Sequence, residues 1–242
     1  MIPKTIHYCW FGRNPLPKDA VRCINSWRKF FPDYEIKEWN EDNFDVNMIS
    51  YTSDAYAAKK YAFVSDFARF WILYHYGGVY FDTDVEVINP MDDIISRGAF
   101  MGIEVVRTYP QVAPGLGIGV EPGHAIYKKA LEHYKGITFV IGDGIVKHES
   151  IVPLTTRLLI EAGMKPNGKL QQVAGIWIYP RDYFNPYDDL TGVLRKTNNT
   201  RSIHWYAASW QQRNSFKKWL SRWTHRILGL RLIFKIKTWL RR

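Results

Sequence analysis

The chain has 242 residues, 46% of them hydrophobic, and carries a formal net charge of +10. This length suits one α/β domain with a sizeable core and is too short for two large domains. The two cysteines, Cys9 and Cys23, do not form a CxxC pair, which argues against a zinc site or a disulfide framework, so we expect buried, reduced thiols. The first residues lack the apolar stretch of a secretory signal, and we therefore predict a cytoplasmic protein.

The positive charge is concentrated at the C-terminus. Nine basic residues and no acidic residue lie from Lys217 onward, which leaves only +1 of the +10 for the rest of the chain. Because a nearly neutral domain is a poor match for a phosphate backbone, no nucleic-acid partner is expected. We predict a catalytic domain over residues 1–215 and a basic tail over residues 216–242.

The tail has the pattern of an amphipathic helix. Five apolar residues fall on one helical stripe, namely Leu220, Trp223, Ile227, Leu230 and Phe234. No apolar run reaches the roughly 18 residues of a membrane span, so we expect a C-terminal basic amphipathic helix that binds an anionic membrane surface, peripherally on the inner face of the plasma membrane. The alternative is a helix packed on the domain with a solvated basic face.

Strands and helices alternate along the rest of the chain. In chain order, we expect strands at residues 5–11, 34–39, 79–81, 85–88, 99–105, 117–120, 175–179 and 202–205, and helices at 17–30, 54–76, 125–134 and 151–162. This alternation predicts an α/β fold with a Rossmann-like mixed central sheet flanked by helices.

Two carboxylates follow the strand at residues 79–81. Chance alone gives roughly 0.75 Asp-x-Asp triplets in a chain of this composition, so the triplet by itself says little. Asp82 and Asp84, however, come directly after a buried apolar run, where charged carboxylates need a positive partner. A divalent cation such as Mn²⁺ or Mg²⁺ would supply that partner, and a solvated turn at the strand end is the alternative.

Asp66 and Arg69 lie one turn apart on the same face of the preceding helix. They sit among aromatic and aliphatic residues, where a purely structural ion pair is less expected, although such i,i+3 pairs are common. We therefore expect polar groups from this helix to converge with the two carboxylates.

Four segments resemble the sugar-binding region of glycosyltransferase family 32. They are SDFAR at 65–69, LYHYGGVYFDTDV at 73–85, IPKTIHYCWFG at 2–12 and SIHWYAASW at 202–210. That family includes bacterial capsule and lipopolysaccharide sugar transferases and yeast initiating mannosyltransferases, and it is distantly similar to the clostridial glucosylating toxins. The resemblance implies a GT-A type fold, a nucleotide-sugar donor, here a UDP-sugar, and retention of the anomeric configuration.

The resemblance also implies roles for individual residues. Trp10 would stack on the nucleotide base, for which a core aromatic is the alternative. Asp66 and Arg69 would contact the donor sugar and its phosphates. Asp82 is expected at the ribose, donor sugar and metal, and Asp84 on the metal, so that Asp66, Arg69 and Asp84 form the catalytic set.

Three further residues complete this assignment near the end of the domain. His204 is the candidate additional metal ligand, and Ser209 and Trp210 are expected to close over the diphosphate. The toxins have an acidic residue in place of His204, so direct ligation of the metal and contact with a phosphate both stay open. No carboxylate is placed by the sequence as a nucleophile, and we expect front-face displacement onto a glycan or lipid-linked acceptor in bacterial surface polysaccharide synthesis.

Two other interpretations fit parts of the sequence. A haloacid-dehalogenase-type phosphatase also places Asp-x-Asp after a strand, but Glu86 stands where those enzymes have Thr or Val. A non-catalytic protein that binds anionic lipid or nucleic acid is the other alternative. The glycine cluster at 115–119 lacks the order of a dinucleotide loop; either the backbone approaches a substrate there or the segment is an ordinary flexible turn.

Overall fold

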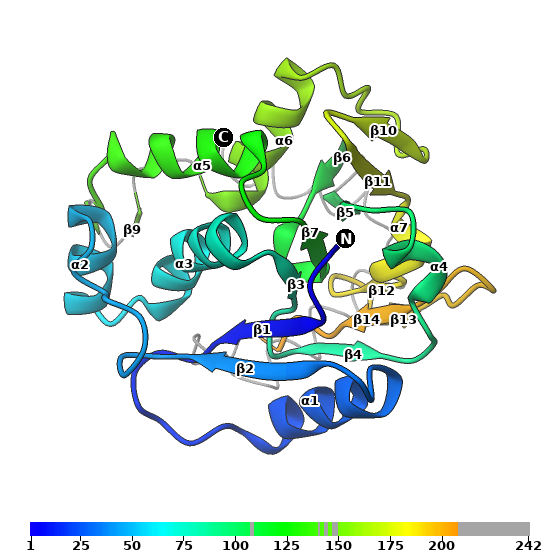
Figure 1. Ribbon diagram of the computed structural model, residues 1–242, viewed down its shortest axis with the longest axis horizontal. Helices are drawn as coiled ribbons and strands as arrows, with labels where there is room; N and C mark the ends of the chain where they lie inside the picture. The colour runs from blue at the N-terminus through cyan, green and yellow to red at the C-terminus, as the bar shows by residue number, and fades with distance from the viewer. Residues whose placement is uncertain (107–108, 140, 143–144, 147–149, 208–242) are drawn as a thin grey trace, which may run out of the picture.

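A mixed sheet forms the centre of the computed structural model, which describes residues 1–106, 109–139, 141–142, 145–146 and 150–207 (Figure 1). Within these residues, the sheet has the strand order β10-β11-β5-β7-β3-β1-β2, with β6 beside β5. Its strands are β1 (Thr5–Cys9), β2 (Glu35–Trp39), β3 (Gly78–Tyr80), β5 (Phe100–Val106), β6 (Tyr109–Val112), β7 (Ile118–Val120), β10 (Gln171–Val173) and β11 (Ile176–Tyr179).

The pairing of the strands is mixed. β1 runs parallel to β2 and β3, and β5 runs parallel to β11. β7 is antiparallel to both of its neighbours, β3 and β5. Smaller ladders join β4 (Val85–Val87) to β14 (Ser202–His204), β12 (Tyr187–Asp188) to β13 (Val193–Leu194), and β8 (Ile141–Gly142) to β9 (Ile145–Val146).

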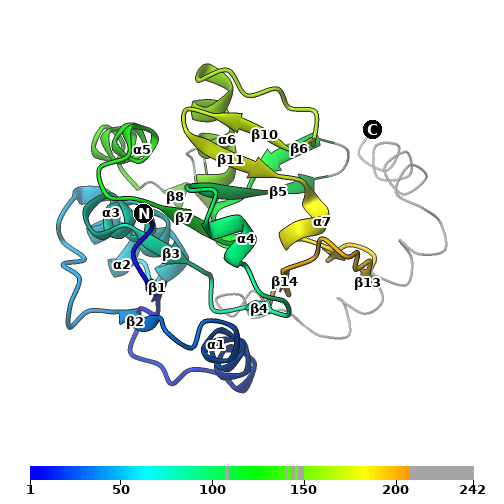
Figure 2. The ribbon, with the colours of Figure 1, turned by 45° about the vertical axis from the view of Figure 1, so that its right-hand side comes forward.

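Helices cover both faces of the sheet, as Figure 1 and Figure 2 show. They are α1 (Lys18–Phe30), α2 (Ser50–Ala57), α3 (Tyr61–Tyr76), α4 (Asp92–Ile95), α5 (Ala125–Lys135), α6 (Ile151–Glu161) and α7 (Arg181–Phe184), with a 3-10 turn at Pro114–Leu116. Neighbouring residues of β1 enter different cores, because side chains alternate along a strand: Tyr8 packs with Trp27 of α1, and Cys9 lies in the core that contains α3. The predicted α/β class with a mixed, helix-flanked sheet is confirmed.

The expected long helix at 54–76 is wrong in one respect, because the chain forms two helices there. α2 ends at Ala57 and α3 begins at Tyr61. Between them Lys59 has a φ of 57°, a left-handed conformation that interrupts a right-handed helix. The predicted end of α3 is confirmed: Gly77 and Gly78 both have positive φ, and a Cβ on Gly78 would lie 2.7 Å from the Thr5 carbonyl oxygen.

Several short elements were not predicted from the sequence. They are α4, α7, β6, β8, β9, β10, β12 and β13, each of four residues or fewer. Both cysteines are buried and free, as expected. The predicted tail helix at 216–242 lies outside the described residues.

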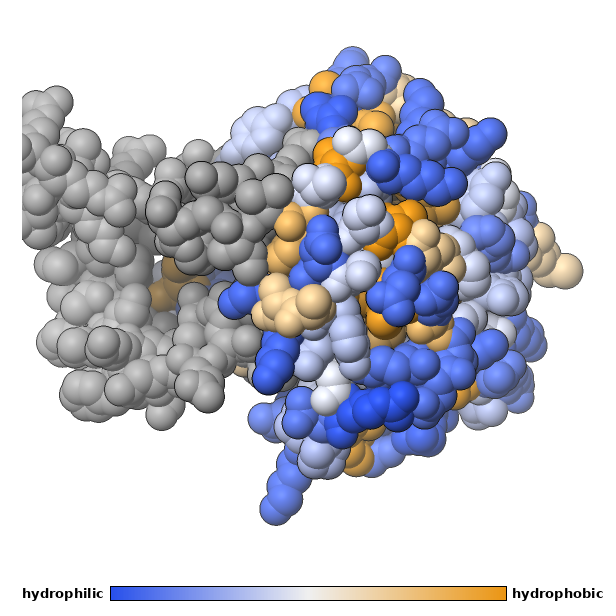
Figure 3. All heavy atoms as spheres, turned by 90° about the vertical axis from the view of Figure 1, so that its left-hand side faces the viewer, coloured by the Kyte–Doolittle hydropathy of each residue, from blue (hydrophilic) through white to orange (hydrophobic). Residues whose placement is uncertain are grey.

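Among the described residues, no helix has the length and apolar character that crossing a bilayer requires. On the face shown in Figure 3, the hydrophobic side chains that can be described form small separate patches among hydrophilic ones. Small scattered patches of this kind are usual on protein surfaces.

Candidate active site

A cleft of about 760 Å³ opens beside the end of β1. One group of lining residues comes from the loop after β1 and from the start of α3, and a second group comes from the ends of β3 and β14. The lining residues are Cys9, Trp10, Phe11, Asn14, Pro15, Pro17, Tyr61, Ala62, Ser65, Arg69, Tyr80, Asp82, Thr83, Asp84, Asp189, His204 and Tyr206. This volume is within the range of small-molecule and cofactor sites.

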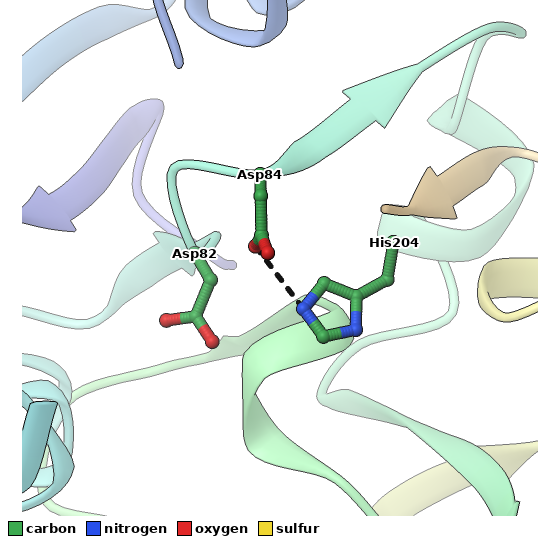
Figure 4. A group of neighbouring side chains, drawn as sticks. All are labelled: Asp82, Asp84 and His204. Carbon is green, nitrogen blue, oxygen red and sulfur yellow. Dashed lines mark ion pairs between the residues drawn. The ribbon is translucent and has the colours of Figure 1, made fainter. Parts of the chain in front are cut away.

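Asp82, Asp84 and His204 form a compact group in this cleft (Figure 4). The two carboxylates follow β3, and His204 ends β14, which pairs with β4 so that His204 lies opposite Val85. One ligand atom from each of the three residues lies within 4.8 Å of the others. The structure thus brings together the three residues that were predicted to hold a metal.

Hydrogen bonds fix the carboxylate of Asp84. Its Oδ1 lies 3.1 Å from Nε2 of His204, and its Oδ2 accepts a hydrogen bond of 2.8 Å from the backbone N–H of Ala207. Burial works against the charged carboxylate, but the neighbouring His204 and these hydrogen bonds lower the pKa of Asp84. Burial likewise opposes the imidazolium, yet Asp84 raises the pKa of His204.

The donor set fits a divalent cation. Two carboxylates and one imidazole offer the oxygen and nitrogen ligands that such ions take. The Nε2 atom of His204 faces the carboxylates, as Figure 4 shows, and is the ring nitrogen that could join them as a ligand. The group could hold Mn²⁺ or Mg²⁺, with open positions left for oxygens of a substrate.

Arg69 links the helix to the carboxylates. Its side chain is only 5% exposed, and its Nη2 lies 3.0 Å from Oδ1 of Asp66 and 3.2 Å from Oδ1 of Asp82. The hydroxyl of Tyr80 donates a 3.2 Å hydrogen bond to Asp82 as well. The expected convergence of Asp66, Arg69 and Asp82 is therefore present, and Arg69 bridges the two carboxylates.

Asp66 lies behind Arg69 and is not among the residues that line the cleft. Burial raises its pKa to about 7, an effect that Arg69 opposes and Asp82 reinforces. In the structure as it stands, Asp66 holds Arg69 in place, and its predicted contact with the donor sugar stays a prediction.

Gly115 allows the chain to pass directly over this ion pair. A Cβ added there would lie 2.1 Å from Oδ2 of Asp82 and 3.3 Å from Nη1 of Arg69. The backbone also engages the site, since the carbonyl of Gly115 accepts a hydrogen bond from the Asp82 N–H. The glycine cluster at 115–119 is buried, so it is not an ordinary flexible turn; its backbone approaches a site carboxylate.

Trp10 belongs to the group of lining residues that comes from the loop after β1. It is half-buried, and its Nε1 donates a 2.6 Å hydrogen bond to the carbonyl of Asn14, which fixes the indole on the loop after β1. Its position on the cleft wall is compatible with stacking on a base, and the residue also packs against the core that contains Trp27. Ser209 and Trp210 lie outside the described residues.

Sequence reasoning missed several residues of the cleft. Tyr80 could have been found, because it lies two residues before Asp82 and alternate strand residues share a face. Asp189 and Tyr206 carried no such signal, since each lies in a loop and reaches the cleft through tertiary structure. Tyr206 also has a positive φ of 50°, unusual for a residue other than glycine.

The site region matches a known family. The family described as "Glycosyltransferase sugar-binding region containing DXD motif" matches residues 17–101, which include Asp66, Arg69, Asp82 and Asp84. Inositol phosphoceramide mannosyltransferase 1 of Schizosaccharomyces pombe is 33% identical over 111 residues, covering 41% of this chain and 33% of that protein. A mannosyl phosphorylinositol ceramide synthase of Saccharomyces cerevisiae is 28% identical over 142 residues, covering 56% of this chain and 36% of that protein.

Among solved structures, the PaToxG glycosyltransferase is similar with a TM-score of 0.48 and 19% sequence identity, over 66% of this chain and 69% of that chain. This chain spans about a third of the length of the two curated relatives. The resemblance to the DXD glycosyltransferases of family 32 is confirmed by the match over the sugar-binding region.

Proposed function

We propose that this chain, a protein like the DXD glycosyltransferases of family 32, transfers a hexose or N-acetylhexosamine from a nucleotide sugar in a metal-dependent reaction. The observation that carries the proposal is the convergence of Asp82, Asp84 and His204 in a cleft that also contains Arg69. We call Asp82, Asp84 and His204 the metal group. The negatively charged diphosphate oxygens of a nucleoside diphosphate would bind at this group, and its aromatic base would lie at the end of the cleft that contains Trp10.

In the proposed reaction, Arg69 and a bound cation stabilise the negative charge of the departing diphosphate. Negative charge grows on the departing diphosphate as the bond to the sugar breaks, and groups aimed at that charge favour the transition state over the ground state. Arg69 supplies a fixed positive charge, since its pKa is raised by Asp82, Tyr80 and Asp66 despite burial. A bound Mn²⁺ or Mg²⁺, held by Asp82, Asp84 and His204, would act as a Lewis acid on the diphosphate.

We propose that Trp10 and the loop after β1, which line the cleft, receive the base. We propose a UDP-sugar as donor, with GDP-mannose as the alternative, because the yeast relatives are mannosyltransferases by name. The acceptor is proposed to be a glycan or a lipid-linked oligosaccharide. A role in bacterial surface polysaccharide synthesis, at the inner face of the plasma membrane, belongs to the same proposal and rests on the sequence pattern of the tail and on the family resemblance.

The test is release of nucleoside diphosphate from a panel of donors. Purified chain would be incubated with UDP-glucose, UDP-galactose, UDP-N-acetylglucosamine and GDP-mannose, with Mn²⁺, with Mg²⁺ and with EDTA. We expect one donor to be hydrolysed in the presence of metal, with the rate lost in EDTA and in Asp84→Asn but kept in Asp54→Asn, which alters an exposed carboxylate on α2. Phosphate release from simple phosphomonoesters, with no donor cleaved, would favour the phosphatase alternative instead.

A further inference from the structure

The turn between β12 and β13 contributes a carboxylate to the cleft that the roles above do not use. Asp189 lies in this turn, is half-buried and lines the cleft together with the metal group and Arg69. The next residue, Leu190, is 42% exposed, so the turn stands at the rim.

Side-chain and backbone hydrogen bonds give this turn a defined shape. The Oδ1 atom of Asp188 accepts hydrogen bonds of 3.0 Å from the backbone N–H groups of both Leu190 and Thr191. Arg181 holds the preceding segment, since its guanidinium donates to the carbonyls of Asn185 and Tyr187. Asp189 is therefore presented from a shaped turn.

The turn is also fixed relative to the metal group. The ring of Tyr187 lies 5.3 Å from that of Trp205, next to His204 in β14. Asn185 donates to the hydroxyl of Tyr206, whose ring lies 4.1 Å from that of His204 and whose hydroxyl donates to Glu104 at 2.9 Å. Contacts from two residues thus tie the base of the turn to the strand end that carries His204.

The location of the turn indicates what Asp189 would meet. In Figure 2, β13 lies beyond β4 and β14 as seen from β1, the strand that Trp10 follows in the sequence. In a nucleotide sugar the reacting carbon is attached to the diphosphate at the end away from the base. If the base lies near Trp10 and the diphosphate at the metal group, the donor sugar and its acceptor would lie farther from β1, on the side where the turn with Asp189 lines the cleft.

We propose that the turn at 188–193 is the acceptor side of the cleft, and that Asp189 accepts a hydrogen bond from a hydroxyl of a polyhydroxylated acceptor, a sugar or a cyclic polyol. A carboxylate is an acceptor-only group with two oxygens, which suits adjacent hydroxyls of such a ring. This role positions the acceptor and requires no proton transfer to Asp189. It rests on the proposed function, because an acceptor side exists only if the cleft binds a sugar donor.

The experiment compares Asp189→Asn with the wild type and with Asp54→Asn. Three readouts are taken with the donor found active. The first is hydrolysis of the donor by water, and the second is transfer to methyl α-D-mannopyranoside, methyl β-D-galactopyranoside and myo-inositol. The third is binding of these three polyols by saturation-transfer NMR in the presence of Mg²⁺ and the nucleoside diphosphate of that donor. We expect the KM for the best polyol to rise about tenfold or more in Asp189→Asn and its NMR signal to fall, with donor hydrolysis unchanged, because a hydrogen bond to a charged acceptor is replaced by one to a neutral amide.

Different results would separate the two proposals. An acceptor KM equal to that of the wild type, or an equal loss of donor hydrolysis and transfer, would overturn the role of Asp189 and leave the donor site standing. Donor hydrolysis by the wild type without transfer to or binding of any of the three polyols would also overturn it. A wild-type chain that cleaves no donor would contradict the proposed function itself. The proposal that the turn is the acceptor side would then be contradicted as well.

Discussion

The Nε2 atom of His204 lies 3.1 Å from Oδ1 of Asp84, although the two residues are far apart in the sequence. Pairing of β14 with β4 produces this contact, and a hydrogen bond from the Trp205 N–H to the Asp84 carbonyl locks the end of the ladder. The same ladder places Asp82 near enough for the three residues to share one cation.

Metal affinity is expected to rise with pH. Without metal, the lowered pKa of Asp84 and the raised pKa of His204 favour an ion pair, which is lost as pH falls through the Asp84 pKa or rises through the His204 pKa. A cation must displace the imidazolium proton, so its binding is weaker where His204 is charged. We expect Mn²⁺ titrations followed by electron paramagnetic resonance to give a higher affinity at pH 8 than at pH 6.

The His204→Gln variant is the control for this dependence, because it removes the titrating group and keeps a polar side chain. Its Mn²⁺ affinity should be lower than that of the wild type at pH 8 and should change little with pH. A wild-type affinity that does not change between pH 6 and pH 8 would show that His204 does not ligate the ion.

Gly115→Ala should lower Mn²⁺ affinity and activity more strongly than it lowers the free energy of unfolding. The added Cβ would meet the carboxylate of Asp82, which Arg69 and Tyr80 hold in place. Forcing a methyl into such a packed position costs roughly 1–3 kcal/mol of unfolding free energy. We expect Mn²⁺ affinity and donor hydrolysis to fall about tenfold or more, as measured beside urea unfolding.

Gly136→Ala is the matched control, since Gly136 has an ordinary φ of −87° and its added Cβ would come no closer than 3.5 Å to another atom. This variant should unfold within about 0.5 kcal/mol of the wild type and keep full activity. Equal activity of the two glycine variants would contradict the close approach at Gly115.

Arg69→Lys should lose both stability and activity. Lysine keeps the positive charge but lacks the planar fork that reaches Asp66 and Asp82 together. With the pair buried, we expect a loss of about 2–4 kcal/mol in unfolding free energy, measured by urea denaturation, and a large fall in kcat. Arg157→Lys, in an exposed pair with Glu161, should change neither by a comparable amount. A stable, fully active Arg69→Lys enzyme would remove Arg69 from the proposed mechanism.

Trp10 should contribute to nucleotide affinity through its ring. Removing an aromatic partner from a stacked base costs about 1–3 kcal/mol, so Trp10→Ala should weaken UDP binding by roughly 5- to 150-fold. Trp10→Phe keeps a stacking face and should lose less. Calorimetric titration with UDP checks both variants, and equal affinity of Trp10→Ala and the wild type would place the base elsewhere.

Local patterns predicted the longer elements of the fold but not the short ones. α1, α5 and α6 have helical spacing of apolar residues, and each was expected within two residues of its observed bounds. The break at Lys59 was missed because a single left-handed residue leaves no periodic signal. Elements such as α4, α7 and β13 are too short for a period to be visible, and their form depends on tertiary contacts.

The candidate site was only partly accessible to sequence reasoning. The pair Asp66 and Arg69 and the triplet of Asp82 and Asp84 are close in sequence, so their spacing could suggest chemistry. His204 entered through the family resemblance alone, because no local pattern states that β14 pairs with β4. Asp189 was not predicted at all, since its place in the cleft is set by contacts of Tyr187 and Asn185.

The central claim is that Asp82, Asp84 and His204 hold a cation that binds the diphosphate of a nucleotide. Calorimetric titration of the chain with UDP, with and without Mn²⁺ and beside Asp84→Ala, tests it most directly. The account predicts tight binding that requires both Mn²⁺ and Asp84, with GDP replacing UDP if the donor is a guanosine sugar. Nucleotide binding of equal strength without metal, or in Asp84→Ala, would contradict it.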